Sequence, residues 1–369
     1  MINLLKNIKS KFGAFIYGFQ KVDLFTLAVF TRQFALMYRS GINILASVRV
    51  LAEQTQNKKL KAALDLIYQH LATGSKTLYG AFKIHPDVFP PVYLAMIAAG
   101  EKSGGAAFSL ILDRLADGLE KQNRLKSKVS AALSYPIIIV SIAFAVIIAS
   151  AYIILPKFVP ILESFNVEKP FATKILIGFI SVLNNFWLAG LLVICIYLLV
   201  NLFIFIIKTP FGRHAVEEIL LSTPVLNRFI IKVNIVYFCR TLSLLYGSGI
   251  PLVDALETTK EVFTLDIYKN YIKNMTTAIK EDGQEMNKYM YNNPLFPAEL
   301  VQIMKVGEET GDLANVLVKL ANLYETELEY VIDTMVHLLE PMIMVLLGGV
   351  VFFIISAVFL PLYKMFGEV

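Results

Sequence analysis

The sequence predicts an all-α membrane protein with two homologous cytoplasmic helical bundles, of about six helices each, and three transmembrane helices. The first observation is the composition: 56% of the 369 residues are hydrophobic and only 17% are charged, which is too apolar for an average soluble protein. The second is that charged residues are missing from three long segments. The third is that one block of sequence occurs twice.

The repeated block begins with FTRQFALMYRSGI at residue 30 and with FCRTLSLLYGSGI at residue 238. Phe, Arg, Tyr, Ser, Gly and Ile recur in register, 208 residues apart. Further matches follow in the same order: Phe89-Pro90 with Phe296-Pro297, Gly100 to Gly104 with Gly307 to Gly311, and Pro136 with Pro341. The offset changes only from 208 to 205 across this span. Because such self-similarity marks one structural unit used twice, we expect two bundles of the same design.

Helical periodicity and its interruptions predict the elements of the first bundle. Asp23 is placed to cap a helix over 24–39, in which apolar residues recur with near 3.6-residue spacing. The pattern then predicts helices over 43–54, 58–81 and 92–99, a tight connection over 100–105, and a long helix that begins near residue 106 and continues to the membrane. Short connections between several helices are typical of a compact bundle. The basic lead before it, residues 1–23, is interpreted as either an amphipathic surface helix or a solvated arm.

Gly41 and Gly249 end the first helix of the two copies. One interpretation is a contact surface. The favoured one is a required turn, because glycine supplies the left-handed residue with which many helices stop. Pro251 aligns with Asn43 at the start of the next helix, where a proline is tolerated because its missing N–H would be unpaired there.

Three segments are long and apolar enough to cross a bilayer. No residue is charged between Lys128 and Lys157, between Lys174 and Lys208, or between Glu340 and Lys364. Each gap exceeds the ~20 residues that a spanning helix needs. The resulting organisation is a lead over 1–23, a first bundle over 24–130, a first span over 131–156, a periplasmic loop over 157–174, a second span over 175–207, a second bundle over 208–340, a third span over 341–362 and a periplasmic tail over 363–369.

The distribution of lysine and arginine predicts the orientation. Residues 1–128 contain 18 of them and residues 208–340 contain 12, whereas the loop 157–174 has three and the tail after residue 341 has one. Positive charge favours the cytoplasmic side, so both bundles and the N-terminus are predicted inside and the C-terminus outside. The repeat requires the same topology, because two copies in one orientation need a returning span.

The two bundles differ in charge. The net charge is +10 for residues 1–128 and −6 for residues 208–340. One interpretation is drift on solvated surfaces. The other is that the bundles attract each other, within or between subunits, or face different partners, since long-range fields affect association more than fold.

The sequence contains little that indicates chemistry. Residues 99–105 resemble a phosphate-binding loop only superficially, because no lysine-hydroxyl pair follows the last glycine. The four histidines are isolated and have no second ligand at metal spacing. No predicted span carries a charged residue, whereas ion-coupled transporters usually place ionisable groups there. The sequence therefore predicts a protein that is not an enzyme and that uses no cofactor or metal.

Two charged pairs recur in both copies. Glu101 and Glu308 each follow a glycine, and the favoured interpretation is a carboxylate that caps the N-terminus of the next helix. An inter-subunit contact and a divalent cation site at Glu308 stay open as alternatives. Arg32 and Arg240 lie on the first helix of each copy. For them a buried ion pair that holds the helical hairpin is favoured over a phosphate contact.

These residues resemble a known family. The helix that ends Arg-x5-Tyr-x-Ser-Gly-Ile, the Phe-Pro pair followed by Gly-Glu-x-Ser/Thr-Gly, and the bundle-span-span-bundle-span layout are similar to the type II secretion F-domain family. Its members are GspF/PilC-like inner-membrane platform proteins of type II secretion systems and type IV pili. The family motif falls on the candidate structural or partner-contact residues Arg32, Gly41, Gly100, Glu101, Gly104, Arg240, Gly249, Gly307, Glu308 and Gly311. The first copy departs after Gly104, where Gly105-Ala106 stands in place of Asp312-Leu313.

The resemblance implies a non-enzymatic platform that couples a cytoplasmic hexameric secretion ATPase to the assembly of type IV pilin or pseudopilin fibres in the bacterial inner membrane. Implied partners are that ATPase, other inner-membrane assembly proteins, pilin or pseudopilin subunits, membrane lipid and further copies of the chain, with no nucleic acid. The alternatives are an oligomeric transporter or channel built from parallel repeats, and a membrane-anchored receptor or scaffold. The choice between type IV pilus and type II secretion stays open.

Overall fold

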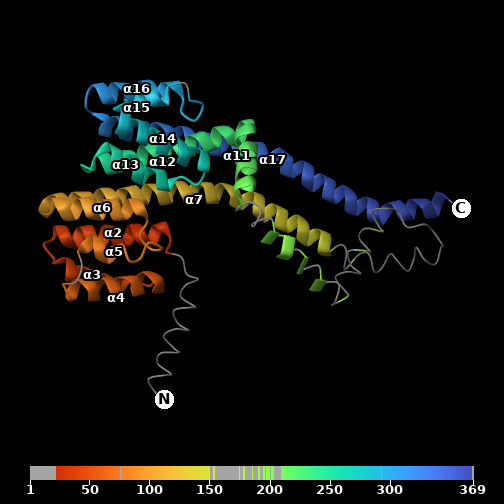
Figure 1. Ribbon diagram of the computed structural model, residues 1–369. Coiled ribbons are helices and arrows are strands. Elements are labelled where there is room, and N and C mark those ends of the chain that lie inside the picture. Colours follow the sequence, from red (N-terminus) through yellow and green to blue (C-terminus); the bar gives the residue numbers. More distant parts are fainter. Residues whose placement is uncertain are drawn as a thin grey trace, which may run out of the picture. The chain divides into compact units, whose positions relative to one another are not determined.

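The regular elements of the protein are helices throughout the part of the chain that the structure describes (Figure 1). A computed structural model describes residues 22–74, 77–149, 209–291 and 293–367, together with isolated residues between 153 and 202. The predicted lead up to residue 21, most of the end of the first span over 150–156, residues 157–173 of the predicted loop and most of the second span over 175–207 lie outside the described residues. The all-α fold class is confirmed.

The first bundle contains six helices, which are α2 (Leu24–Arg39), α3 (Ile44–Gln54), α4 (Lys58–Ala72), α5 (Leu78–Phe82), α6 (Pro91–Ser103) and the start of α7 (Gly105–Ala149). Local signals set their beginnings. The Asp23 carboxylate accepts from the Thr26 N–H at 3.2 Å, and the Asn57 side chain accepts from two N–H groups of α4. Such caps satisfy the N–H groups that a helix start leaves without partners.

The second bundle repeats this order with α12 (Pro224–Tyr246), α13 (Leu252–Thr259), α14 (Asp266–Asp282), α15 (Met286–Met290), α16 (Ala298–Glu309) and the start of α17 (Leu313–Gly367). A short 3-10 helix, η2 (Lys260–Val262), follows α13. The prediction of two bundles with six helices each is confirmed. A further helix, α11 (Pro210–Ser222), precedes the second bundle.

The repeated Phe-Pro pairs place a phenylalanine in the core of each bundle. Phe89 packs against Phe30 of α2 with ring centroids 6.3 Å apart, and Phe296 packs against Phe238 of α12 at 5.3 Å. All four rings are at most 3% exposed. The prolines that follow come just before, or at, the N-terminus of α6 and α16, where a missing N–H costs little.

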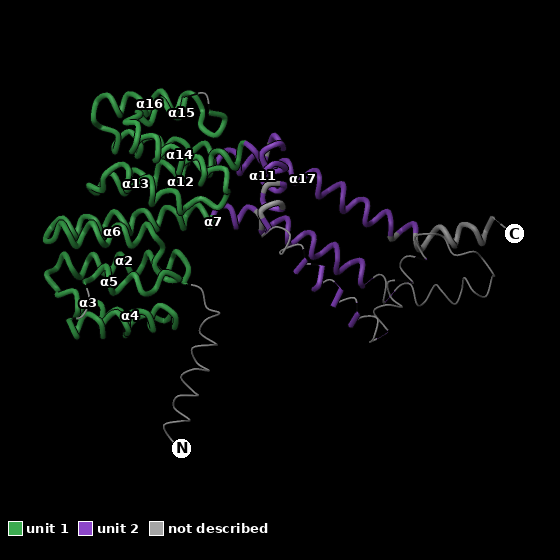
Figure 2. Tube along the Cα trace, in the orientation of Figure 1, with its two compact units in different colours: residues 1–127, 228–328 green, residues 128–227, 329–369 purple. Residues whose placement is uncertain are grey.

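The chain divides into two compact units (Figure 2). One unit comprises residues 1–127 and 228–328 and therefore contains both bundles, which meet where α6 contacts α13 and η2. The other comprises residues 128–227 and 329–369. It includes α11 and the apolar ends of α7 and α17.

Two predicted boundaries were wrong. The helix predicted over 58–81 is two helices, α4 and α5, and the Thr77 hydroxyl caps the second by accepting from the Gly80 N–H at 3.0 Å. The helix predicted over 92–99 continues to Ser103, so the predicted connection over 100–105 shrinks to the turn at Gly104. Gly100 does not end the helix: it lies within α6 and is not among the glycines with positive φ, whereas Gly104 is.

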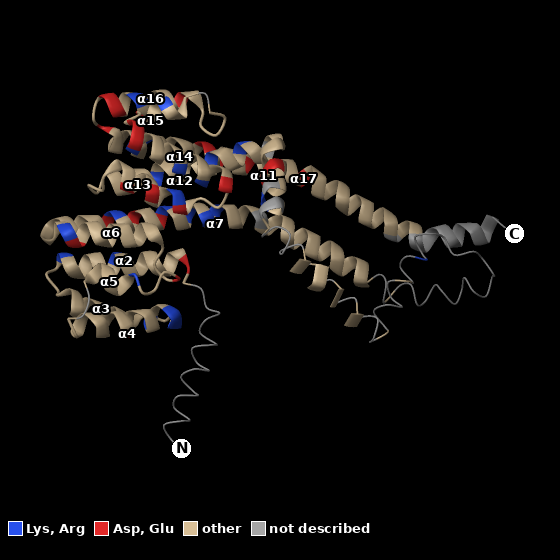
Figure 3. Cartoon of the chain, in the orientation of Figure 1, with Lys and Arg blue, Asp and Glu red and all other residues tan. Residues whose placement is uncertain are grey.

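Three described helices are long and apolar enough to cross a membrane, as judged by length and composition. α7 contains residues 131–149 of the predicted first span over 131–156, and α17 contains the predicted third span over 341–362. Only 6% of the most apolar window of each helix is buried within the protein. α7 carries no charged residue after Lys128, and α17 carries none between Glu340 and Lys364; Figure 3 shows these stretches in tan as far as they are coloured. The third, Leu226–Tyr246, was not predicted as a span; half of its window is buried, because α12 packs into the second bundle.

Candidate functional site

The first pair of repeated residues, Gly41 and Gly249, forms a turn between two helices in each bundle. Their φ angles are +80° and +85°, in the left-handed region. The next N–H, from Ile42 and from Ile250, returns to a carbonyl five residues earlier at 3.0 and 3.2 Å. This is the hydrogen-bonding pattern of a helix that stops at a glycine. Asn43 then caps α3 with its side chain, whereas Pro251 precedes α13 without such a bond.

Arg32 joins α2 to the long helix α7. Its guanidinium pairs with three carboxylates of that helix: Asp117, Glu120 at 3.0 Å and Asp113 at 3.4 Å. The pKa of Arg32 is raised above its ordinary value, chiefly by the hydrogen bonds to Glu120 and Asp117. The Arg32 side chain is 30% exposed, so the ion pairs are partly screened by solvent.

Arg240 makes the equivalent connection in the second bundle. It pairs with Glu325 of α17 and donates to the Asn322 side chain at 3.0 Å. Both arginines contact a carboxylate that lies 85 positions further along the chain. The Arg240 and Glu325 side chains are only 14% and 18% exposed.

The repeated arginine therefore makes an ion pair in both copies. The pair is largely buried at Arg240, as expected, whereas at Arg32 it is partly exposed, and in both copies the carboxylate lies on a different helix from the expected one. We expected the arginines to hold the hairpin of the first two helices. Instead each arginine ties the first helix of its bundle to the last one, which continues into the apolar segment. The sequence did not show this contact, because the carboxylates lie more than 80 positions after the arginine, on the last helix of the bundle.

Glu101 and Glu308 cap helix N-termini, but these belong to the preceding helices α5 and α15. The Glu101 carboxylate accepts from the N–H groups of Leu78 and Tyr79 at 2.7 and 3.0 Å. A carboxylate at a helix N-terminus is favourable because it meets unpaired N–H groups and the positive end of the helix dipole. The expected cap of the next helix is thus corrected: Glu101 lies near the C-terminal end of α6 and its side chain reaches back to α5.

Glu308 repeats this geometry. Its carboxylate accepts from the N–H groups of Met286 and Asn287 at 2.9 and 3.1 Å, and from the Asn287 side-chain amide at 2.7 Å. Both oxygens thus have donors within the bundle. In the described ranges of the chain, no group of three or more His, Cys, Asp or Glu side chains is placed to hold a metal ion.

Gly100 and Gly307 allow two helices to pack closely in each bundle. A Cβ atom added at Gly100 would lie 2.2 Å from the Phe108 ring of α7, and one added at Gly307 would lie 2.9 Å from Val316 of α17. No side chain larger than hydrogen fits there without movement. Gly104 and Gly311, with φ of +62° and +72°, then turn the chain into the long helices.

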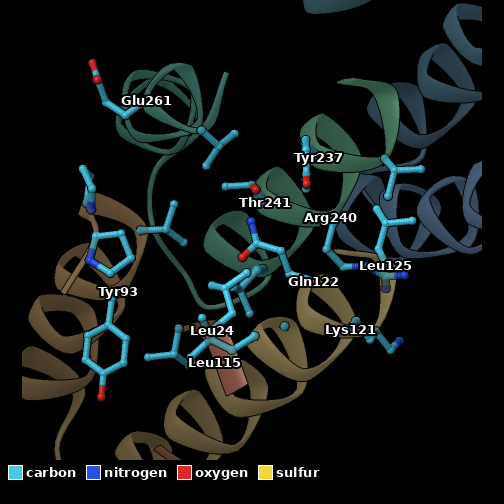
Figure 4. Close-up of a pocket in the computed structure, with 18 of the residues that line it drawn as sticks. Leu24, Tyr93, Leu115, Lys121, Gln122, Leu125, Tyr237, Arg240, Thr241 and Glu261 are labelled. Atoms are coloured by element: carbon cyan, nitrogen blue, oxygen red, sulfur yellow. The ribbon is translucent and has the colours of Figure 1, made fainter. Parts of the chain in front are cut away.

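A cavity of about 210 Å³ lies where the two bundles meet inside their common unit (Figure 4). Residues from α6 and α7 form one side, and residues from α12 and η2 form the other. Next to it α7 and α12 pack closely, since a Cβ atom at Gly118 would lie 3.2 Å from Leu244. The Arg114 guanidinium also donates to the Gly247 carbonyl oxygen. The sequence did not predict this cavity, because no local pattern tells which faces of the two bundles meet.

Comparison with known proteins identifies both copies as one kind of domain. The family model described as type II secretion system (T2SS), protein F matches residues 30–156 and 238–361. The two matches begin at the same residues as the repeated block.

Individual relatives match over nearly the full chain. A type IV pilus assembly protein PilC of Myxococcus xanthus is 33% identical over 356 residues, which cover 96% of this chain and 84% of that protein. The PilC of Pseudomonas aeruginosa is 30% identical, with coverage of 99% and 96%. A type II secretion system protein F of Aeromonas hydrophila is 28% identical, with coverage of 92% and 86%. The chain therefore belongs to the type II secretion system protein F family, which includes assembly proteins of type IV pili.

Proposed function

We propose that this protein is a non-enzymatic inner-membrane platform that couples a cytoplasmic secretion ATPase to the assembly of type IV pilin or pseudopilin fibres. Its relatives are named for type IV pilus assembly and type II secretion. The N-terminus and both bundles face the cytoplasm in this proposal, and the C-terminus faces the periplasm. Partners are a hexameric ATPase, other inner-membrane assembly proteins, the fibre subunits and further copies of the chain.

One observation carries the coupling: α7 and α17 are each a single helix that starts in a bundle core and ends in exposed apolar residues. In α7, Phe108, Leu112 and Leu115 are at most 2% exposed, whereas Ile137 and Ile138 are 63% and 57% exposed. A helix is stiff except where a proline, glycine or bulge interrupts its hydrogen bonds. α7 has no proline or glycine over 119–135 and α17 has none over 313–340, whereas Pro136 and Pro341 stand where the apolar segments begin. A displacement of the bundle would thus travel along an uninterrupted stretch of helix up to that proline.

The repeated polar residues support a role without catalysis. Arg32 and Arg240 fasten the long helices to the bundles, while Glu101 and Glu308 fasten short helices to α6 and α16. Each of these side chains has a structural partner that accounts for its presence. A coupling protein needs such fastenings, because a load applied to one helix must be shared by the whole bundle.

The coupling can be tested by breaking α7 between its buried and its apolar part. Lys126 is an exposed residue of this helix. Lys126→Pro removes one helical hydrogen bond and introduces a clash with a backbone carbonyl, which together cost ~3 kcal/mol or more. Lys126→Ala is the matched control, since alanine preserves the helix. Both variants are expressed in a host from which the natural copy has been deleted.

We expect Lys126→Pro to insert into the membrane and retain the ATPase in pull-downs, yet to assemble no surface fibres or pseudopili. Lys126→Ala should assemble them normally. Normal fibre assembly by a correctly inserted Lys126→Pro protein would refute coupling through α7. Solute flux through liposomes that contain the protein and no ATPase would instead favour a transporter or channel.

A further inference from the structure

The cavity between the bundles has mostly apolar walls and a few polar groups inside. Leu115, Leu119 and Leu125 line it from α7, and Val236 and Leu244 line it from α12. Among the lining residues, Pro91, Lys121 and Glu261 are exposed, which marks where the cavity opens to solvent. The interior is therefore reachable from the aqueous phase.

Three polar side chains of the lining, Gln122, Tyr237 and Thr241, make no hydrogen bond to any residue that the structure describes. Thr241 is only 8% exposed. The polar atoms of all three keep contact with the open space of the cavity, since the sealed side-chain atoms without a partner in the described chain belong to His85 and Asn227. The Tyr237 hydroxyl is a neutral donor at ordinary pH, and burial raises its pKa further.

Thr241 differs in this respect from the fully buried threonines of the bundles. The hydroxyls of Thr31, Thr259 and Thr276 each donate to the carbonyl four residues earlier, at 2.7 Å. Thr241 also lies in a helix, α12, but its hydroxyl makes no such bond to a described residue. In Figure 4 Thr241 lies beside the cavity, and the amide of Gln122 is directed toward the side of the cavity on which Thr241 lies.

The charged residues at the edge are largely engaged elsewhere. Arg240 pairs with Glu325, and Glu261 pairs with Lys260 at 3.6 Å. Lys121 is exposed to solvent. The interior thus offers hydrogen-bonding groups without a buried free charge, which favours a neutral occupant.

Water meets few protein partners in much of this space, because most of the wall is apolar. Water molecules beside the leucines and valines pair only with one another or with solvent at the opening, whereas an ordered water is well held by two to four polar groups. A molecule that covers the apolar walls would displace these waters into the solvent. Its own polar group could hydrogen-bond with the polar side chains of the lining.

We infer that this cavity is a binding site for a compact, uncharged small molecule of about ten non-hydrogen atoms, with an apolar body and a hydroxyl or carbonyl group. The apolar body lies against the leucines of α7, and the polar group pairs with Gln122, Tyr237 or Thr241. Because the walls come from both bundles, the bound molecule adds contacts between α7 and α12 and stabilises their packing. This site does not depend on the proposed coupling to an ATPase.

The test uses 4-fluorophenol as the probe and the full chain in lipid nanodiscs. Fluorine NMR measures binding, and empty nanodiscs give the partitioning of the probe into lipid. We expect a saturable component that only the protein supplies. Thr241→Val and Gln122→Leu keep the shape of the cavity and remove one polar group each, so each should weaken binding by about 3- to 10-fold.

Two further variants complete the test. Thr241→Phe fills the cavity and should abolish saturable binding, whereas Thr277→Val, at an exposed threonine of α14, should leave it unchanged. The inference is overturned if the protein adds no saturable binding to that of empty nanodiscs. It is also overturned if Thr241→Val and Gln122→Leu both bind as the natural protein does, an outcome that can be read even if Thr241→Phe does not fold.

Discussion

Replacing Gly100 by alanine tests whether close packing of α6 on α7 explains the glycine at this position. The new Cβ atom would lie 2.2 and 2.8 Å from two carbon atoms of the Phe108 ring. That ring is 2% exposed and is held between Tyr38, at a centroid distance of 4.8 Å, and Phe34, at 6.2 Å. The ring cannot turn away without disturbing its neighbours, so the backbone must separate or the aromatic cluster must repack.

The magnitude follows from two opposing effects. Overpacking a dense core costs about 1–3 kcal/mol. Alanine in place of glycine within a helix returns about 0.5–1 kcal/mol. The balance predicts a loss of about 1–2 kcal/mol in the free energy of unfolding, which lowers the melting temperature of a unit of this size by about 2–8 °C.

The assay is thermal unfolding of the purified full chain, followed by far-ultraviolet circular dichroism in detergent. Gly348→Ala is the control, because nothing lies within 4 Å of a Cβ atom at that position of α17. Phe108→Leu in the Gly100→Ala background should recover part of the loss, since it removes the ring atoms that clash. A Gly100→Ala protein that melts at or above the natural temperature would show that the contact with Phe108 does not require glycine.

Two further predictions concern charged and titratable groups of the bundles. Arg240→Met leaves the Glu325 carboxylate, which is 18% exposed, without its main partner, and should lower the free energy of unfolding by about 1.5–3 kcal/mol. The double variant Arg240→Met/Glu325→Leu should recover most of this loss. Equal melting temperatures for the single and double variants would contradict the pairing. The pKa of His85 is lowered, mainly by burial and further by His70, although Asp87 opposes the shift, and its Nε2 atom has no hydrogen-bond partner in the described part of the chain. The unfolded chain therefore binds the proton more readily, so stability is greatest above the ordinary histidine pKa of about 6.5 and falls as the pH drops below it. His85→Gln should make the melting temperature fall less steeply between about pH 7 and pH 5.5. If the slope equals that of the natural protein, protonation of His85 does not cause the loss of stability.

The opposite charges of the bundles stay a prediction. One ion pair joins α7 to α17, between Lys128 and Glu329, and both residues lie within the unit that contains the apolar helix ends. Its side chains are 43% and 39% exposed, so its contribution to stability is small. Attraction between the +10 and −6 segments would be most evident as a salt dependence of association with partners or other copies.

Several features were accessible from the sequence because they depend on neighbouring residues. The turns at Gly41 and Gly249 need a left-handed residue after a helix, and these residues have φ of +80° and +85°. The cap at Asp23 needs only the next three residues. The first and third spans are read from the absence of charge over a sufficient length. Because the block occurs twice in the sequence, the helices predicted for the first bundle also predicted a second bundle of the same design.

The partners of the charged residues were not accessible in this way. Glu101 was recognised as a cap, but the helix that it caps precedes it by more than twenty positions. Arg32 was recognised as one half of an ion pair, but its carboxylates lie on a helix that closes the bundle. In each case the residue type predicted the kind of interaction, and only the packing selected the partner.

The sequence by itself determined the class of fold, the doubled design and the positions of the turns, because helical periodicity, capping and left-handed glycines are local properties. Only the tertiary structure decided why Gly100 and Gly307 have no side chain, which helices the arginines and glutamates fasten, and where the bundles leave a cavity. These depend on how closely surfaces far apart in the chain approach each other. Such distances are set by the sum of many packing contacts, which no short stretch of sequence contains.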